Sequence, residues 1–160
     1  MTTKMQFVKR LTRAHEEVRA LLPDIDIHME IYPGWTIKEM LAHLAGWDDA
    51  MILALRAYIA GDTPPTPANR GIDAYNAQTV AERSNLNYDQ IVREWEWVRE
   101  QLIPILYQIK EEELETIIVA PWGPSMTITQ MLNIIIHHEE EHAEVIQARM
   151  ANPGQALQAH

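Results

Sequence analysis

The sequence predicts an all-α protein in which a single domain, residues 1–160, folds as a four-helix bundle. Four long segments space their apolar residues three and four positions apart, as one buried face of a helix requires. Most of the proline, glycine and asparagine lies between these segments. A chain of 160 residues is long enough for one domain with a sizeable core.

The first two helices have clear ends in the sequence. The first is predicted over residues 4–22, because Pro23 cannot continue it. The second is predicted to begin after Thr36, whose hydroxyl can form a capping box with Glu39, and to end at Gly61.

A proline-rich loop, GDTPPTPANRG, leads from the second helix to a short additional helix predicted over residues 73–83. The third long helix is predicted to start with Asn87 and Gln90 as a cap pair and to reach Ile109. It passes through Pro104, where we expect a kink because proline removes one backbone hydrogen bond.

The fourth long helix is predicted from Thr127, which pairs with Gln130 as a cap, to about Met150. Before it, the segment TIIVAPWGPSM combines a β-prone run with turn residues, which is compatible with a short extended piece or a hairpin, although an isolated pair of strands would be marginal alone. The connections between the long helices are long, so the order need not be up-down-up-down.

Composition excludes several classes of protein and of site. The chain has no cysteine, so it has no disulfide, thiolate ligand or cysteine nucleophile. A formal net charge of −10 argues against nucleic acid as a partner, because phosphate binding needs lysine and arginine. The sequence has no apolar run of about 18 residues and no signal-peptide centre, so we predict a cytoplasmic protein without membrane contact.

The sequence HHEEEH, which starts at His137, is the strongest candidate site. His138 and His142 are four positions apart, so both rings lie on one face of a helix. They continue the apolar stripe that contains Ile135, whereas His137 is rotated by about 100° and is expected to point elsewhere. Imidazoles that face a core need polar partners, and a metal ion supplies one for each ring.

A third histidine, His43, lies on the apolar stripe of the second helix between Met40 and Trp47. With His138 and His142 it would give three imidazoles from two facing helices and leave an open position on the ion. Three imidazoles without a thiolate favour zinc or nickel. The alternative is that His43 is a core histidine held by hydrogen bonds.

Glu139 is the candidate catalytic residue, because HEEEH matches H-E-x-x-H, in which the glutamate acts as a general base. A zinc protease of that type would need a third ligand later in the chain, and only eighteen residues follow His142. A di-iron bundle would need a second E-x-x-H motif, which the sequence lacks. We therefore expect a mononuclear site, with Glu140 and Glu141 mainly facing solvent.

Three further residues are predicted to line a pocket beside the histidines. Trp47 lies one turn beyond His43, and Trp95 lies on the apolar stripe of the third long helix. His15 lies on the buried face of the first helix. For each of these residues, simple filling of the core is the alternative.

The stretch WTIKEMLAHLAGWDD and, far downstream, HHEEEHAEVIQ resemble the DinB-like superfamily, and the overall layout is most similar to its ClbS/DfsB branch. The resemblance covers nearly the whole chain and includes the short segment with Tyr75 and Asn76. It implies an up-down-down-up bundle, often dimeric, that binds a divalent metal through His43, His138 and His142.

The resemblance leaves two functions open. Characterised relatives include metal-dependent transferases and isomerases that use low-molecular-weight thiols, and a protein that protects against a DNA-damaging metabolite. The first hypothesis is therefore a metal-dependent transferase or hydrolase that acts on a small molecule, with a thiol cosubstrate, in detoxification or stress resistance. The second is a protein that binds and sequesters a small molecule without turnover.

The resemblance also implies a homodimer. Isologous pairing of helices would bury apolar side chains that lie off the main stripes. The residues in question are Ile134, Ile136, Trp97 and Ile103.

Overall fold

The computed structural model describes residues 3–158, which form helices and one small hairpin. The α-helices are α1 (Lys4–Leu21), α2 (Ile37–Ala60), α3 (Ile72–Glu82), α4 (Tyr88–Gln108) and α5 (Ile128–Ala151). The connections contain two strands, β1 (Ile117–Val119) and β2 (Ser125–Thr127), and two 3-10 turns, Leu22–Asp24 and Glu111–Glu113. The predicted all-α fold with a short additional helix is confirmed.

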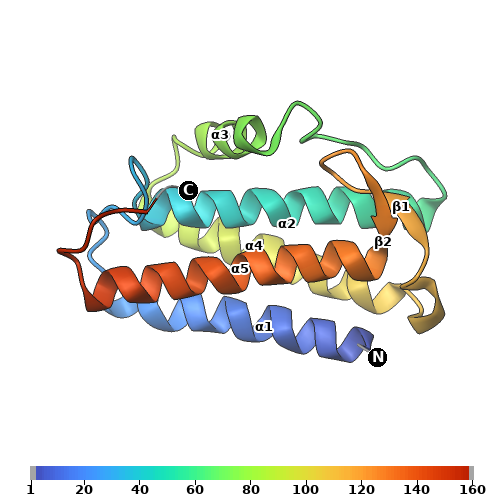
Figure 1. The fold of residues 1–160 in the computed structure, drawn as a ribbon, viewed down its shortest axis with the longest axis horizontal. Helices are drawn as coiled ribbons and strands as arrows, with labels where there is room; N and C mark the ends of the chain where they lie inside the picture. The colour runs from blue at the N-terminus through green and yellow to red at the C-terminus, as the bar shows by residue number, and fades with distance from the viewer. Residues whose placement is uncertain (1–2, 159–160) are drawn as a thin grey trace.

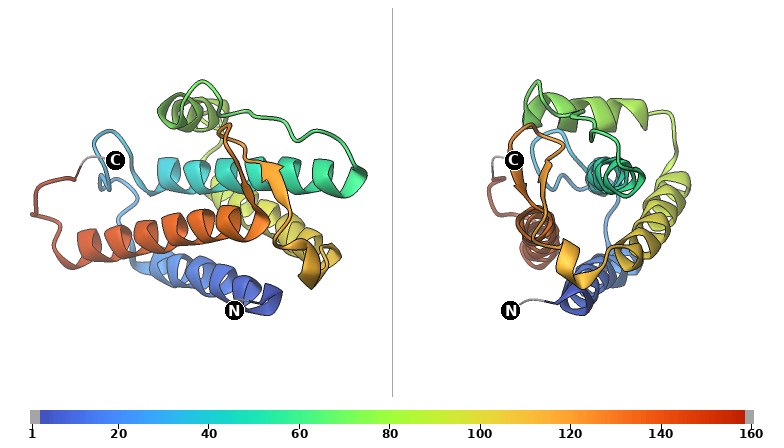
Figure 2. Two further views of the ribbon diagram at one scale, coloured as in Figure 1. Left: turned by 45° about the vertical axis from the view of Figure 1, so that its right-hand side comes forward. Right: turned by 90° about the vertical axis from the view of Figure 1, so that its right-hand side faces the viewer.

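The four long helices form a bundle in up-down-down-up order (Figure 1). Helices α1 and α5 run in one direction, and α2 and α4 run in the other. Within the bundle α2 packs against α4 and α1 packs against α5, as the views in Figure 2 show. Helix α3 lies outside the bundle against α2, on the side where the functional site is found.

Side-chain caps fix the helix starts that the sequence predicts. The side chain of Asn87 accepts from the N–H of Gln90 at 2.9 Å, and Gln90 accepts from the N–H of Asn87 at 2.8 Å. Thr127 and Gln130 form the same reciprocal pair at the start of α5. Helix α4 remains helical through Pro104. The kink at this proline stays a prediction.

The small hairpin holds the loop that precedes α3. Strands β1 and β2 pair antiparallel, and Gly123 in their turn has a φ of 115°, a conformation that favours glycine. The N–H of Ala68 in the proline-rich loop donates to the carbonyl of Pro121 at 3.0 Å. This bond ties the loop to the hairpin and so helps to place α3 over α2.

The apolar residues off the predicted stripes differ in exposure. Trp97 and Ile134 are 57% and 47% exposed, and Ile103 is partly buried against the core. Ile136 is fully buried, so its predicted availability for a subunit interface is wrong. The reason is that α5 contacts α1, α2 and β2 and therefore has a wider buried face than one stripe. No helix among residues 3–158 is long and apolar enough to cross a membrane.

Gly46 allows α3 to approach α2 closely. A Cβ at this position would lie 2.5 Å from the Cβ of Thr79 on α3. The hydroxyl of Tyr75, also on α3, donates to the carbonyl oxygen of Gly46 at 2.6 Å. Glycine in a helix costs about 0.5–1 kcal/mol relative to alanine, and here the close contact with α3 requires it.

We expect Gly46→Ala to lower the free energy of unfolding by about 1–3 kcal/mol, the usual range for overpacking. Thr79 is buried and branched at Cβ, so relief requires a shift of α3. Urea unfolding followed by circular dichroism would measure the effect. Gly154→Ala is the control, because its new methyl group meets nothing within 4 Å. Equal stability of Gly46→Ala and the parent protein would contradict the close docking of α3.

Candidate metal centre

Helices α2 and α5 bring three histidine rings together. The Nε2 atom of His43 is 3.2 Å from that of His138 and 3.1 Å from that of His142. The Nε2 atoms of His138 and His142 are 2.8 Å apart. His43 and His142 are buried and His138 is half-buried. The three residues that spacing selected in the sequence therefore meet at one point.

The three nitrogens fit one common ion. Nitrogens held about 2.0–2.1 Å from a tetrahedral ion lie about 3.4 Å from one another, close to the 2.8–3.2 Å found here. The group contains imidazoles alone, with no carboxylate or thiolate among its described members. This donor set suits a borderline divalent metal such as zinc or nickel.

Tyr32, in the loop before α2, contacts the triad from outside. Its hydroxyl oxygen is 3.0 Å from Nδ1 of His142. A ring that offers Nε2 to a metal carries its proton on Nδ1, so Nδ1 donates to Tyr32 and the bond fixes the ring. Burial, with a contribution from the charge of Glu141, raises the pKa of Tyr32, so the phenol stays neutral.

A tight turn places this tyrosine. The N–H of Trp35 donates to the carbonyl of Tyr32 at 2.9 Å, and Gly34 between them has a φ of 78°, which favours glycine. The same turn brings the Trp35 ring to 5.1 Å from the ring of His43. The loop before α2 therefore contacts two of the three histidines.

We expect Tyr32→Phe to weaken metal binding by about 10–100-fold, the usual cost of losing a hydrogen bond that orients a ligand. The phenyl ring keeps the packing, so the fold should be retained. Competition with a chromogenic chelator would measure the dissociation constant. Tyr107→Phe is the matched control, because Tyr107 is 49% exposed. Equal affinity in Tyr32→Phe and Tyr107→Phe would show that Tyr32 does not orient His142.

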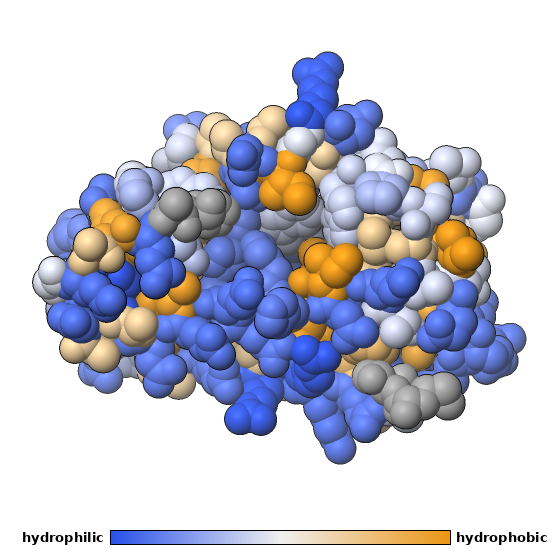
Figure 3. Space-filling model, in the orientation of Figure 1, coloured by the Kyte–Doolittle hydropathy of each residue, from blue (hydrophilic) through white to orange (hydrophobic). Residues whose placement is uncertain are grey.

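A cavity of about 460 Å³ opens beside the triad, a size typical of small-molecule sites. Figure 3 shows this face of the molecule hollowed between α3 and α5. The cavity is lined by Tyr32, Ile72, Asp73, Asn76, His138, Glu141, His142, Glu144, Val145 and Gln158. An adjoining pocket of about 130 Å³ is almost entirely apolar and is lined by Trp47, Ile72, Trp122, Ile134, Ile135 and His138. The two spaces share Ile72 and His138.

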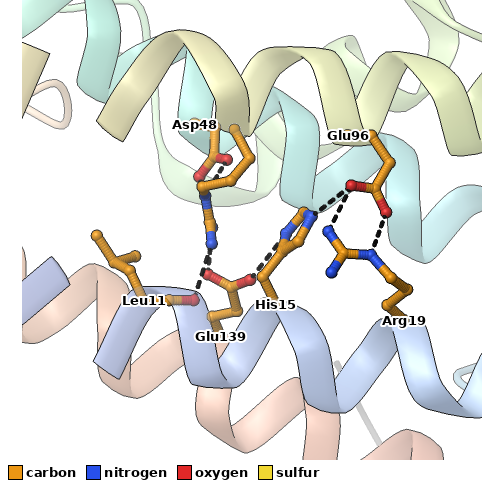
Figure 4. Close-up of polar contacts among 7 residues, drawn as sticks. Leu11, His15, Arg19, Asp48, Glu96 and Glu139 are labelled. Atoms are coloured by element: carbon orange, nitrogen blue, oxygen red, sulfur yellow. Dashed lines mark hydrogen bonds and ion pairs between the residues drawn. The ribbon is translucent and has the colours of Figure 1, made fainter. Parts of the chain in front are cut away.

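Glu139, the candidate catalytic residue, has its partners in the bundle interior (Figure 4). Its carboxylate accepts from Nη2 of Arg99 at 2.5 Å and lies 3.8 Å from Nδ1 of His15. Arg99 also donates to both carboxylate oxygens of Asp48, at 2.9 and 3.1 Å, and to the carbonyl of Leu11 at 3.0 Å. Arg99 thereby links all four helices of the bundle. A role of Glu139 as general base stays a prediction.

The charges of this buried cluster change one another's pKa values. Burial alone would lower the pKa of Arg99, but Asp48 and Glu139 outweigh it and raise that pKa. Burial alone would raise the pKa of Glu139, but Arg99 and His15 outweigh it and lower that pKa. At Asp48 burial prevails and the pKa is raised. Arg99 and Glu139 therefore form a buried ion pair at neutral pH.

His15 and Trp95 lie beside this cluster and line neither of the two cavities at the triad. Their rings stack with centroids 3.7 Å apart. His15 also contacts Glu96 at 3.3 Å, and Glu96 accepts from Arg19, whose hydrogen bond lowers the pKa of Glu96. Of the three predicted pocket residues, the structure places Trp47 at the triad.

The remaining residues of HHEEEH face outward, as the helical spacing predicts. The side chain of His137 is 70% exposed and its Nε2 lies 3.1 Å from a carboxylate oxygen of Glu141. Glu140 accepts from Arg10 of α1 at 2.6 Å at the surface of the bundle. His137 and Glu140 therefore belong to the solvated side of α5, whereas Glu141, although exposed, lines the cavity beside the triad.

Several residues of the site region were not selected from the sequence, among them Arg99, Asp48 and Tyr32. Arg99, one turn after Trp95, and Asp48, directly after Trp47, each interrupt the apolar face of a helix. Charged residues at such positions could have indicated a buried ion pair. Tyr32 lies in a loop, where no periodicity indicates which way a side chain points.

The protein family is established by comparison with known proteins. The model of the DinB superfamily matches residues 6–146, so the chain belongs to this superfamily. The chain is also similar to the uncharacterized protein YuaE of Bacillus subtilis (strain 168). The two are 29% identical over 118 residues, which span 68% of this chain and 72% of YuaE.

Solved structures share the fold at low sequence identity. DfsB, described as a sibling lethal factor precursor, superposes with a TM-score of 0.78 at 18% identity over 98% of this chain and 99% of DfsB. An uncharacterised protein from Escherichia coli UTI89 gives 0.78 at 14% identity, with 98% of each chain covered. A mycothiol-dependent maleylpyruvate isomerase gives 0.62 at 18% identity over 99% of this chain and 65% of the isomerase.

Proposed function

We propose that this protein is a metal-dependent enzyme, a transferase or hydrolase, that acts on a small molecule. The observation that carries the proposal is the meeting of three imidazole nitrogens beside a 460 Å³ cavity, which His138 and His142 line. His43, His138 and His142 would hold the ion. When bound, a divalent ion lowers the pKa of a coordinated water or thiol and so supplies a nucleophile near neutral pH.

The chain's own residues would organise this chemistry. Tyr32 holds the ring of His142, and the apolar pocket around Trp47 gives one side of His138 an apolar surrounding. Since the chain has no cysteine, a thiol nucleophile would have to arrive on a cosubstrate. The structural likeness to a mycothiol-dependent isomerase supports a low-molecular-weight thiol in this role.

A second candidate function is sequestration of a small molecule without turnover. The apolar pocket next to His138 supports it, because such a pocket can retain a hydrophobic group without any reaction. The likeness to DfsB covers the whole length of that protein and is compatible with either function.

We also propose that the protein forms a homodimer, because two large apolar side chains are exposed. Trp97 on α4 and Ile134 on α5 remain 57% and 47% exposed, and an isologous contact would bury such residues. Light scattering at micromolar concentration that gives the mass of one chain would contradict a stable dimer.

Turnover with and without metal tests the proposed enzyme. Protein loaded with zinc or nickel should hydrolyse activated esters, or add a monothiol such as 2-mercaptoethanol to an electrophile, faster than the same protein after chelation. His43→Ala should remove the activity and His137→Ala should retain it. Stoichiometric binding of the electrophile that persists after chelation, with no turnover, would support sequestration and contradict the enzyme.

A further inference from the structure

The cavity beside the triad has an acidic rim. Asp73 of α3 and Glu141 and Glu144 of α5 line it, and all three are exposed to solvent. The described residues that line this cavity include no lysine or arginine. The rim therefore attracts cations to the mouth of the site and repels anions.

Asn76 supplies a neutral donor deeper in the same cavity. Only 4% of this residue is exposed, and its Oδ1 accepts from Nε1 of Trp47 at 2.8 Å. An indole N–H can only donate, so this bond fixes the orientation of the amide and leaves Nδ2 on the opposite side. Among residues 3–158, Nδ2 makes no hydrogen bond, and Asn76 lines the cavity. The buried amide is thus directed at a ligand position, where it would donate to an acceptor.

The apolar pocket completes the arrangement. It adjoins the cavity at Ile72 and His138, and the indole of Trp47 that orients Asn76 also forms part of its wall. An apolar group in this pocket, an acceptor at Asn76 and a cation at the rim would all lie around His138.

We infer that the site binds a small molecule that carries an ammonium group, a neutral carbonyl and an apolar or aromatic group. In this assignment, which rests on the proposed function, the acidic rim contacts the ammonium group and Asn76 Nδ2 donates to the carbonyl. The pocket between Trp47 and Trp122 holds the apolar group. The three carboxylates of the rim disfavour molecules with a net negative charge, and the positive charge of an ion at the triad acts in the opposite direction.

Three probes of similar shape test the ammonium contact and the carbonyl contact separately. N-(2-aminoethyl)benzamide has the aromatic ring, the carbonyl and the ammonium group. N-propylbenzamide lacks the charge, and 4-phenylbutylamine lacks the carbonyl. Zinc-loaded protein should bind the first probe at least about fivefold more tightly than the second, the order of one exposed ion pair. The difference should shrink as salt is raised from 20 to 500 mM, because the rim is open to solvent.

Variants assign the contacts. The triple variant Asp73→Asn, Glu141→Gln, Glu144→Gln changes exposed side chains only, and it should bind the two benzamides equally. Glu112→Gln, an exposed carboxylate outside the cavity, is the control and should keep the preference. Asn76→Ala should weaken binding of N-(2-aminoethyl)benzamide about tenfold more than binding of 4-phenylbutylamine, because only the first probe loses a hydrogen bond, whereas an unfolded variant would lose both.

The outcomes separate this inference from the proposed function. Equal binding of the two benzamides by the parent protein, or a preference that survives in the triple variant, would overturn the inference. Binding is measured by calorimetry and needs no turnover. If the inference is overturned in this way, metal-dependent turnover of other compounds would still support the proposed function. Conversely, the protein could show the predicted selectivity but no metal-dependent turnover. That result would support the inferred ligand class and contradict the proposed enzymatic function.

Discussion

Replacing His142 by alanine is expected to remove the bound metal. Its Nε2 lies within 3.1 Å of both other ring nitrogens, so the variant leaves two donors, and two imidazoles do not complete a zinc site. We expect metal content after dialysis against micromolar zinc to fall from about one ion per chain to below about one in ten. Elemental analysis by mass spectrometry would measure it.

His137→Ala is the matched control for this change. His137 belongs to the same run of residues on α5, but its side chain is 70% exposed and contacts Glu141. The control should retain the metal content of the parent protein. If His142→Ala keeps its metal while His137→Ala loses it, the ion is bound at the exposed face of α5 and the triad is not the site.

Arg99→Met is expected to cause the largest loss of stability. The change leaves the carboxylates of Asp48 and Glu139 buried without their cation, and it also removes the donor to Leu11. Breaking a buried ion pair at one partner typically costs about 3–5 kcal/mol. Urea unfolding followed by circular dichroism would give the free energy. Arg13→Met should change it little, since Arg13 is 82% exposed and pairs with Glu17.

The pH dependence of the Arg99→Met variant gives a second test. In the parent protein the pKa of Glu139 is lower in the folded state than in the unfolded state, so Glu139 stabilises the fold at any pH above its unfolded-state pKa. This contribution is lost only as the pH falls towards the folded-state pKa. Without Arg99, burial would instead raise the pKa of Glu139, and the variant would be destabilised while this carboxylate is charged. The difference in free energy of unfolding between the parent protein and Arg99→Met should therefore shrink as the pH falls from 7 towards 5. A difference that is constant with pH, or absent at pH 7, would contradict a buried ion pair.

The sequence was sufficient to predict the positions of the helices and the three histidines of the triad. Helical periodicity and capping pairs such as Asn87 with Gln90 depend on residues close together in the chain, and the structure contains both. His138 and His142 could be assigned to one face because four positions make about one turn. His43 needed the further assumption that the apolar faces of two helices meet, which the bundle fulfils.

Contacts between distant segments could not be predicted in this way. Arg99 meets Asp48 across 51 positions and Glu139 across 40, and no local pattern specifies which helices pack together. Glu139 has the right motif for a general base, yet one position from His138 on a helix is a rotation of about 100°, which turns it towards α4. Asn76 is directed at the cavity only because the hairpin and Gly46 hold α3 in place.

Anomalous diffraction from crystals of the zinc- or nickel-loaded protein, collected at the absorption edge of the metal, tests the central claim most directly. The claim predicts one strong peak enclosed by the Nε2 atoms of His43, His138 and His142, about 2.0–2.2 Å from each nitrogen. It also predicts that the remaining coordination position faces the cavity lined by Asn76 and Tyr32. Saturating metal with no peak at the triad, or with the strong peak at surface carboxylates instead, would contradict it.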